Sequence, residues 1–279
     1  MIKNIINIIN QAKIHAKMVK NMFIDEYLNT HLYKNNKYVS NPALLNNYEF
    51  SVYSQNGEDG ILMEIFNRIG KTNNYFVEIG VQDGNECNSG LLLTSKWKGL
   101  WIEANKSHYK SITNQFSSFI KDANLQVVNN FVTAENIEDL FRGASVPKDF
   151  DLLSIDIDGN DYWIWKALAS FRPRVVMIEY NAVFRPPLKW IMKYKQNHVW
   201  DKTNYYGASL EALSNLGKVM GYKLVCCDFT GTNAFFVADE CINEKFYKPG
   251  YVDFHYHPQR YFLSAYSFYK SKNGPCVSE

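Results

Sequence analysis

The middle of the chain alternates between short apolar runs and segments with the spacing of amphipathic helices. Five runs are rich in Val, Ile and Leu without polar alternation, and they lie at 75–79, 99–103, 125–129, 151–156 and 174–179. The helix-like segments are 58–69, 86–96, 107–119, 135–143 and 160–170. Strands of this kind are buried on both faces, and strands separated by helices pair in parallel. The pattern predicts a parallel sheet with helices on both faces.

The pattern changes after the fifth run. A long segment at about 182–206 is rich in Trp, Tyr, Pro and Lys, and helical spacing resumes at 209–220. Two further strand-like runs, at 222–227 and 233–237, flank a turn at Gly231 that suits an antiparallel hairpin. A parallel sheet that finishes in a hairpin is one domain, expected at 49–243.

Two extensions flank this domain. Residues 1–48 carry apolar side chains at intervals of three and four, from Ile2 to Phe23, which predicts one or two helices. Such helices could cap the domain, contact a partner or pair with a second copy, so they are the candidate surface for a homo-oligomer. Residues 244–279 form a C-terminal extension.

Composition and charge exclude several classes of function. Hydrophobic residues make up 46% of the 279 residues, and 30 basic against 28 acidic side chains give a net charge of +2. No general field for nucleic acid follows from that balance. The five cysteines form no CxxC pair, which indicates reduced, cytoplasmic usage. The chain lacks a signal-peptide core and any run near the ~20 apolar residues of a membrane span.

A glycine-rich turn follows the first buried run, with the spacing Glu78-x-Gly80-x-x-x-Gly84. Glycines at this strand end let the chain turn sharply and let a ligand touch the backbone. Gln82 stands where a dinucleotide fingerprint needs its second glycine, so the spacing suits a cofactor without a pyrophosphate. The second strand ends at Glu103, where a carboxylate grips a ribose diol. Together these motifs predict a nucleoside-containing cofactor, and a plain strand-to-helix turn is the alternative.

Acidic side chains gather where the fourth and fifth strands end. Asp156, Asp158 and Asp161 follow the fourth, and Glu179 and Asn181 follow the fifth. Neighbouring parallel strand ends bring Asp156, Glu179 and Asn181 together as a candidate site for Mg²⁺ or Ca²⁺. The alternatives are a general base without metal, or capping of the next helix by Asp158 and Asp161.

As a set, these motifs resemble S-adenosylmethionine-dependent methyltransferases of the FkbM-like group. The resemblance covers about 50–240 and includes the glycine turn, Glu103 and the segments 54–60, 155–159, 199–201, 207–210 and 231–237. It implies a Rossmann-like class I methyltransferase fold, a mostly parallel seven-stranded sheet with an antiparallel last strand. It also implies O-methylation of a hydroxyl of a sugar, sugar-nucleotide or glycan, as in polysaccharide modification. At position 158 typical relatives carry Glu, where this chain has the shorter Asp.

The resemblance assigns S-adenosyl-L-methionine to a set of cofactor-binding positions. They are Gln55, Gly57, Glu78, Gly80, Asp83, Gly84, Glu86, Glu103, Asn130, Phe131 and Asp156. Within that set Glu103 is expected to hold the ribose, Asn130 and Phe131 the adenine, and Gln55 and Gly57 to close the cofactor from the N-terminal side. The glycine turn is expected around the methionine part.

Methyl transfer is an in-line displacement, so the enzyme aligns the acceptor and helps to remove its proton. Asp156 with Asp158, or a metal held there, is the first candidate for this assistance, and His198 is the second. His255 and His257 lack a third ligand and are interpreted as structural. Two other functions stay open, a nucleoside-binding helper of a glycan-modifying enzyme and an NAD(P)-linked sugar epimerase or reductase.

Aromatic residues, 15% of the chain, gather after the fourth and fifth strands. They include Trp163, Trp165, Tyr180, Phe184, Trp190, Tyr194, Trp200, Tyr205 and Tyr206. Flat apolar faces with polar edges suit sugar rings, so a lid that faces the substrate is expected here, with some of these residues in the core.

Overall fold

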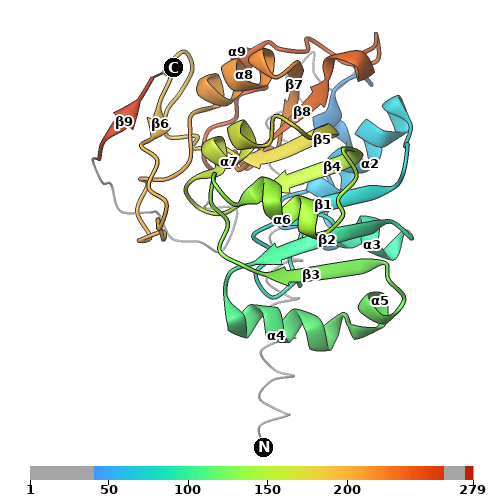
Figure 1. Cartoon of the computed structure of the whole chain (residues 1–279). Helices are drawn as coiled ribbons and strands as arrows, with labels where there is room; N and C mark the ends of the chain where they lie inside the picture. Colours follow the sequence, from blue (N-terminus) through green and yellow to red (C-terminus); the bar gives the residue numbers. More distant parts are fainter. Residues whose placement is uncertain (1–40, 261–273, 279) are drawn as a thin grey trace, which may run out of the picture.

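The computed structural model describes residues 41–260 and 274–278. Its main sheet contains β1 (Tyr75–Ile79), β2 (Lys98–Glu103), β3 (Leu125–Asn129), β4 (Asp149–Ile155), β5 (Arg172–Glu179), β7 (Tyr222–Cys227) and β8 (Asn233–Ala238). The strand order is β3-β2-β1-β4-β5-β8-β7 (Figure 1). Only β8 runs against its neighbours, since it pairs antiparallel with both β5 and β7. The predicted seven-stranded sheet with an antiparallel last strand is confirmed.

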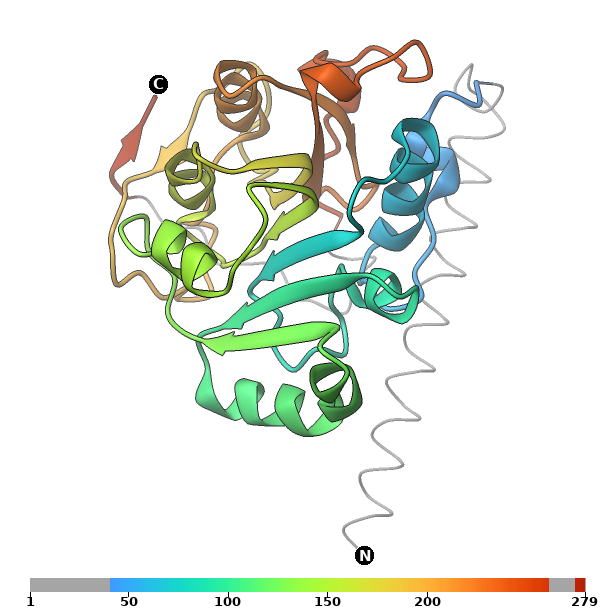
Figure 2. The same cartoon turned by 45° about the vertical axis from the view of Figure 1, so that its right-hand side comes forward.

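Helices cover both faces of this sheet, as predicted. They are α2 (Glu58–Ile69), α3 (Gly90–Thr94), α4 (Lys106–Gln115), α5 (Ser117–Lys121), α6 (Ile137–Gly143), α7 (Asp161–Ala167), α8 (Leu210–Val219) and α9 (Val252–His255). Two short 3-10 helices are η2 (Leu45–Tyr48) and η3 (Asp239–Cys241). Figure 2 shows α2 and η2, in blue, on one side of the sheet and the green α6 and α7 on the other.

Two apolar cores explain why the strands lack alternation. On β1, Phe76 packs into the core beneath α2 to α5, whereas Val77 and Ile79 pack into the core beneath α6 to α8. On β5, Met177 packs into the core beneath α2 to α5, and Ile178 packs into the core beneath α6 to α8. Because both faces of the central strands β1, β4 and β5 are largely buried, these strands have continuous apolar sequences. The edge strands β3 and β7 each expose one polar side chain, Gln126 and Lys223.

The extensions are described only in part. Residues 1–40, and with them the expected helices and the candidate oligomer surface, lie outside the described residues. The C-terminal extension contacts the main domain, since β9 (Cys276–Val277) pairs with β6 (Ile191–Met192) inside the long aromatic segment. The Arg260 N–H also donates to the Thr230 carbonyl. Within 41–260 and 274–278, every helix is too short or too polar to cross a bilayer.

Candidate functional site

A polar cavity of about 140 Å³ lies at the carboxyl ends of β1, β4 and β5. It is lined by Gln55, Asn56, Glu58, Glu78, Gly80, Val81, Gln82, Glu86, Asn88, Asp156, Asp158, Glu179, Trp200, Thr232 and Asn233. The strand order reverses between β1 and β4, and ligands of open α/β sheets bind at such a reversal. Among these described lining residues, six carry carboxyl groups and none is Lys or Arg. The cavity therefore favours a ligand with positive charge.

The two predicted glycines of the turn have different roles. Gly80 lines the cavity with φ of +88°, and a Cβ there would lie 1.7 Å from the Asp156 carbonyl oxygen. Gly84, with φ of +80°, faces the protein interior instead, where a Cβ would meet the Phe116 ring at 2.7 Å. Gly80 thus shapes the cavity, while Gly84 allows the packing of α4 against the turn.

Glu78 lies at the cavity but already holds the next helix. Its buried carboxylate accepts the backbone N–H groups of Asn88 at 2.7 Å and Ser89 at 2.9 Å, and also the Ser89 hydroxyl. Burial raises the pKa of Glu78, and the Ser89 hydroxyl and the two N–H groups oppose that rise. The amides of Asn88 and Ser89, which directly precede α3, are therefore occupied by a carboxylate of the protein itself.

Glu103 ends β2 and anchors the glycine turn. Its Oε2 accepts the Gln82 N–H at 2.9 Å, and its Oε1 accepts the Asn105 N–H at 2.7 Å. The side chain is buried and does not line the cavity. A carboxylate has about four lone-pair positions, so two further bonds to a ligand are compatible with these contacts.

The remaining predicted cofactor positions surround the cavity at varying distance. The Gln55 amide donates to Glu86 Oε2 at 3.1 Å, and both side chains line the cavity. Asn130 lies beside Glu103, because its N–H donates to the Glu103 carbonyl, and Phe131 follows it with 40% of its surface exposed. Gly57 and Asp83 do not line the cavity. Gly57 caps α2 with φ of +97°, and Asp83 accepts the Asn85 N–H.

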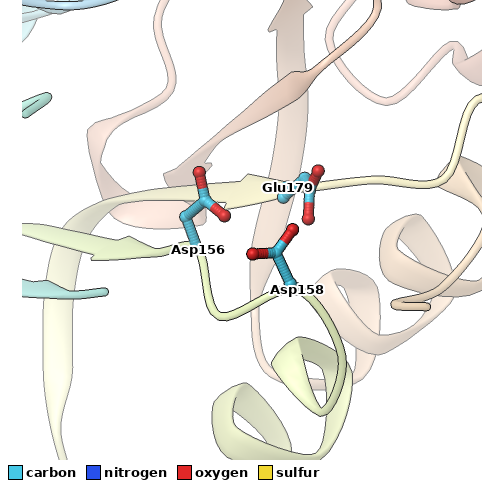
Figure 3. A group of neighbouring side chains, drawn as sticks. All are labelled: Asp156, Asp158 and Glu179. Carbon is cyan, nitrogen blue, oxygen red and sulfur yellow. The ribbon is translucent and has the colours of Figure 1, made fainter. Parts of the chain in front are cut away.

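Three carboxylates meet on the other side of the cavity. Asp156, Asp158 and Glu179 each offer an oxygen, and these oxygens lie within 4.8 Å of one another. Figure 3 shows the three side chains turned toward a common space. Burial raises the pKa values of Asp156 and Glu179 well above the ordinary range, and the neighbouring carboxylates raise them further. Burial and the nearby Asp161 raise the pKa of Asp158 to about 6.

Asp161 stabilises the loop that carries these acids. Its carboxylate accepts the Ile157 N–H at 2.9 Å and the Gly159 N–H at 2.8 Å. Asp158 adopts a left-handed conformation with φ of +53° within this loop. Neither acid caps the helix: Asp161 binds amides of the loop before α7, and the Asp158 side chain faces Asp156 and Glu179.

Asn181 does not join the carboxylates that it was expected to accompany. Its side-chain amide donates to the carbonyl oxygens of Asn204 and Tyr206, at 2.9 Å each, and its Oδ1 accepts the Val183 N–H at 3.2 Å. The side chain is fully buried and outside the lining of the cavity. Asn181 thus holds the aromatic segment in place.

His198 and Trp200 bring the aromatic segment to the acidic loop. A Cβ on Gly159 would lie 2.3 Å from Cδ2 of His198, so the imidazole packs directly on that loop. Trp200 lines the cavity, and its indole N–H donates to the Thr203 carbonyl. His255 is buried and His257 is half-buried, and removal from water lowers the pKa of His255 to about 4 and that of His257 to about 3.

Three of the nine aromatic residues of the expected lid are core residues, as was expected of some of them, and they cannot form a lid. Trp165, Tyr180 and Tyr206 are at most 1% exposed and belong to the core. Phe184 and Trp190 stack at 4.1 Å between ring centroids and are half-buried. Of the nine, only Trp200 reaches the cavity lining.

Sequence reasoning missed a polar pair in the cavity wall. The Asn233 amide donates to Glu58 Oε1 at 2.8 Å, and both residues line the cavity. Asn233 begins β8 and pairs in register with Glu179. The signal was present, because Asn233 lies in the 231–237 motif of the resemblance, yet the 175 residues between the partners hid the contact.

The sequence matches no protein-family model and no curated protein. Solved structures with a similar chain path include magnesium protoporphyrin IX methyltransferase from Synechocystis PCC 6803 with bound S-adenosylmethionine. The two share 9% identity over 78% of this chain and 97% of that one, with a TM-score of 0.42. An S-adenosylmethionine-dependent methyltransferase from Clostridium acetobutylicum ATCC 824 gives 10% identity, 78% and 98% coverage and a TM-score of 0.41. A putative O-methyltransferase from Klebsiella pneumoniae shares 13% identity with this chain. The match covers 77% of this chain and 96% of that one, with a TM-score of 0.42.

Nothing about activity follows from likenesses at this level, and the fold is assigned from the chain's own strand order. That order, with β8 reversed between β5 and β7, confirms the predicted Rossmann-like sheet of the class I methyltransferase type. Membership of this chain in the FkbM-like group stays a prediction.

Proposed function

We propose that this chain is an S-adenosylmethionine-dependent O-methyltransferase that acts in the cytoplasm on a hydroxyl of a sugar, sugar-nucleotide or glycan. One observation carries the proposal: a single cavity joins the Gly80 turn of β1 to the carboxylates at the ends of β4 and β5. A sulfonium cofactor suits a lining rich in carboxyl groups, because its positive charge offsets theirs. The acceptor then lies between the cofactor and the acidic cluster.

The Glu78 carboxylate, which lies just before α3, argues against an NAD(P)-linked epimerase or reductase. A dinucleotide places its pyrophosphate on the free N–H groups of the helix that follows β1. Here the Asn88 and Ser89 N–H groups are bound by Glu78. A pyrophosphate at this place would have to displace that carboxylate and would be repelled by it.

The chemistry requires a proton acceptor beside the acceptor hydroxyl. As the hydroxyl oxygen bonds to the methyl carbon, the carbon–sulfur bond breaks and S-adenosylhomocysteine leaves as a neutral thioether. The hydroxyl proton passes to a carboxylate oxygen of Asp156 or Asp158. A general base works best with a pKa near the operating pH, and the pKa of Asp158 is raised to about 6.

Two features support a saccharide acceptor. Trp200 offers a flat indole face in a cavity whose other walls are mostly polar, which suits the alternating faces and edges of a sugar ring.

Mg²⁺ belongs to the proposal as a second cofactor. When bound, it supplies positive charge that stabilises a developing alkoxide.

A transfer assay with methyl-labelled S-adenosylmethionine tests this function. The full chain is incubated with a panel of neutral glycans, amino sugars and sugar-nucleotides. We expect label in an alkali-stable ether on at least one saccharide. An alkali-labile ester or a labelled amine would overturn hydroxyl methylation. Tight cofactor binding without transfer to any acceptor would favour the alternative, a non-catalytic nucleoside-binding helper.

A further inference from the structure

We propose that Asp156, Asp158 and Glu179 form a divalent-cation site, with Asp158 in the place that the sequence gives to Asn181. The role of the cation in methyl transfer rests on the proposed function, whereas its binding does not. The ligand class is a hard cation such as Mg²⁺, Mn²⁺ or Ca²⁺, because all three donors are carboxylate oxygens.

The spacing of the oxygens suits one ion. One oxygen from each residue lies within 4.8 Å of the other two, and Figure 3 shows the carboxylates converging from the ends of β4 and β5. Ligands held at 2.1–2.5 Å from a common ion are separated from one another by about 3–5 Å. Small side-chain rotations therefore bring all three to one ion.

An unsatisfied atom points to the same ligand independently. Glu179 is 7% exposed, and its buried Oε2 accepts no hydrogen bond from the described residues. A buried carboxylate oxygen without a donor is costly, because it has lost its water and gained no partner. Among the described residues, the buried acids Asp161 and Asp151 do have donors: Asp161 accepts two N–H groups, and Asp151 accepts several donors including Arg174. Asp59 also has one unsatisfied oxygen, but its other oxygen accepts three N–H groups, whereas no hydrogen bond to the Glu179 side chain is seen among these residues. A cation supplies the missing partner of Glu179.

The described wall of the cavity offers the cluster no lysine or arginine as a source of positive charge. Asp161 is unsuited as a fourth ligand because both of its oxygens accept N–H groups of the loop. That loop in turn directs Asp158 toward Glu179, so Asp161 acts as a positioning residue for the site.

Titration of the metal-free full chain with Mn²⁺ tests the site without cofactor or acceptor. Electron paramagnetic resonance and calorimetry report the free and bound ion. We expect one bound Mn²⁺ that Mg²⁺ displaces, and at least tenfold weaker binding for Glu179→Gln and for Asp158→Asn. The control Asp139→Asn removes an exposed carboxylate that contacts Arg142 on α6, and it should bind Mn²⁺ as the wild type does.

Thermal denaturation separates loss of the site from loss of the fold. Mn²⁺ should raise the Tm of the wild type, whereas Glu179→Gln should keep a cooperative transition with no response to the ion. Absence of Mn²⁺ binding by the wild type, or unchanged binding by Glu179→Gln, would overturn the proposal. Either result would remove Mg²⁺ from the proposed function but leave methyl transfer itself standing, because cofactor binding and methyl transfer are measured separately.

Discussion

A Cβ atom on Gly80 would lie 1.7 Å from the backbone carbonyl oxygen of Asp156, so the ends of β1 and β4 approach to a distance that only glycine allows. This contact joins the two halves of the cavity. The turn that is expected to receive the cofactor and the loop that carries the acids are held in one fixed arrangement.

Substitution of this glycine should disrupt both halves at once. For Gly80→Ala we expect the free energy of unfolding to fall by at least about 2 kcal/mol, because the positive φ alone costs on the order of 1–3 kcal/mol. Urea denaturation measures the loss. The control is Gly143→Ala, where a Cβ meets nothing within 4 Å. Equal stability of Gly80→Ala and the wild type would show that the ends of β1 and β4 can move apart to admit a side chain at position 80.

Two variants can show whether a carboxylate or an imidazole accepts the proton of the acceptor hydroxyl. We expect Asp156→Asn to lower kcat by about 100-fold or more, since a general base contributes about 10²–10⁴. His198→Ala should lower kcat by less than about tenfold, because His198 packs on Gly159 and acts on the loop rather than on the acceptor. Steady-state kinetics at saturating substrates decide between them, and the reverse order of effects would assign the proton to His198.

Much of the fold could be predicted because local patterns determine it. The apolar run at 75–79 coincides with β1, since a strand buried on both faces needs no alternation to be recognised. The run at 125–129 coincides with β3, although β3 is an edge strand and its Gln126 is exposed. The site was less predictable. Asn181 has the right residue type at a strand end, yet its amide bonds carbonyls 23 and 25 residues away in the aromatic segment. Nor does a sequence show that the Trp165 indole fills the core.

A buried ion pair lies at the opposite end of β4. It should affect the stability of the fold but not the binding of the cofactor. Asp151 is fully buried, accepts the Thr72 and Asn74 N–H groups and lies 3.0 Å from the Arg174 guanidinium. We expect Asp151→Asn to cost about 3–5 kcal/mol at pH 7 by urea denaturation. The affinity of the folded protein for S-adenosylhomocysteine should not change. A loss below about 1 kcal/mol would contradict this role.

The pH dependence of that pair has a definite sign. Burial raises the pKa of Asp151, but Arg174 and the Thr72 and Asn74 donors outweigh it, so the pKa is lowered overall. The stabilisation is therefore present above the unfolded pKa of about 4 and is lost as the pH falls through the folded value. The difference between the wild type and Asp151→Asn should shrink below about pH 4.

Asp228 should act in the opposite direction. Burial, followed by the charge of Glu58, raises the pKa of Asp228 to about 7. The folded state then binds a proton that the unfolded state releases near pH 4, so this group lowers stability as the pH rises from about 4 to 7. We expect the free energy of unfolding of Asp228→Asn to fall less steeply between pH 5 and 8. One proton contributes at most about 1.4 kcal/mol per pH unit, and equal slopes for the variant and the wild type would refute the assignment.

Calorimetric titration of the full chain with S-adenosylhomocysteine tests most directly whether this cavity binds the methyl donor. We predict one-to-one binding by the wild type and at least tenfold weaker binding by Glu103→Ala, which removes the carboxylate that anchors Gln82 and is expected to hold the ribose. The control is His108→Ala, whose ring lies 3.7 Å from Glu103 and is partly exposed, and it should bind as the wild type does. A folded wild-type protein that binds neither S-adenosylhomocysteine nor S-adenosylmethionine would contradict the proposed function.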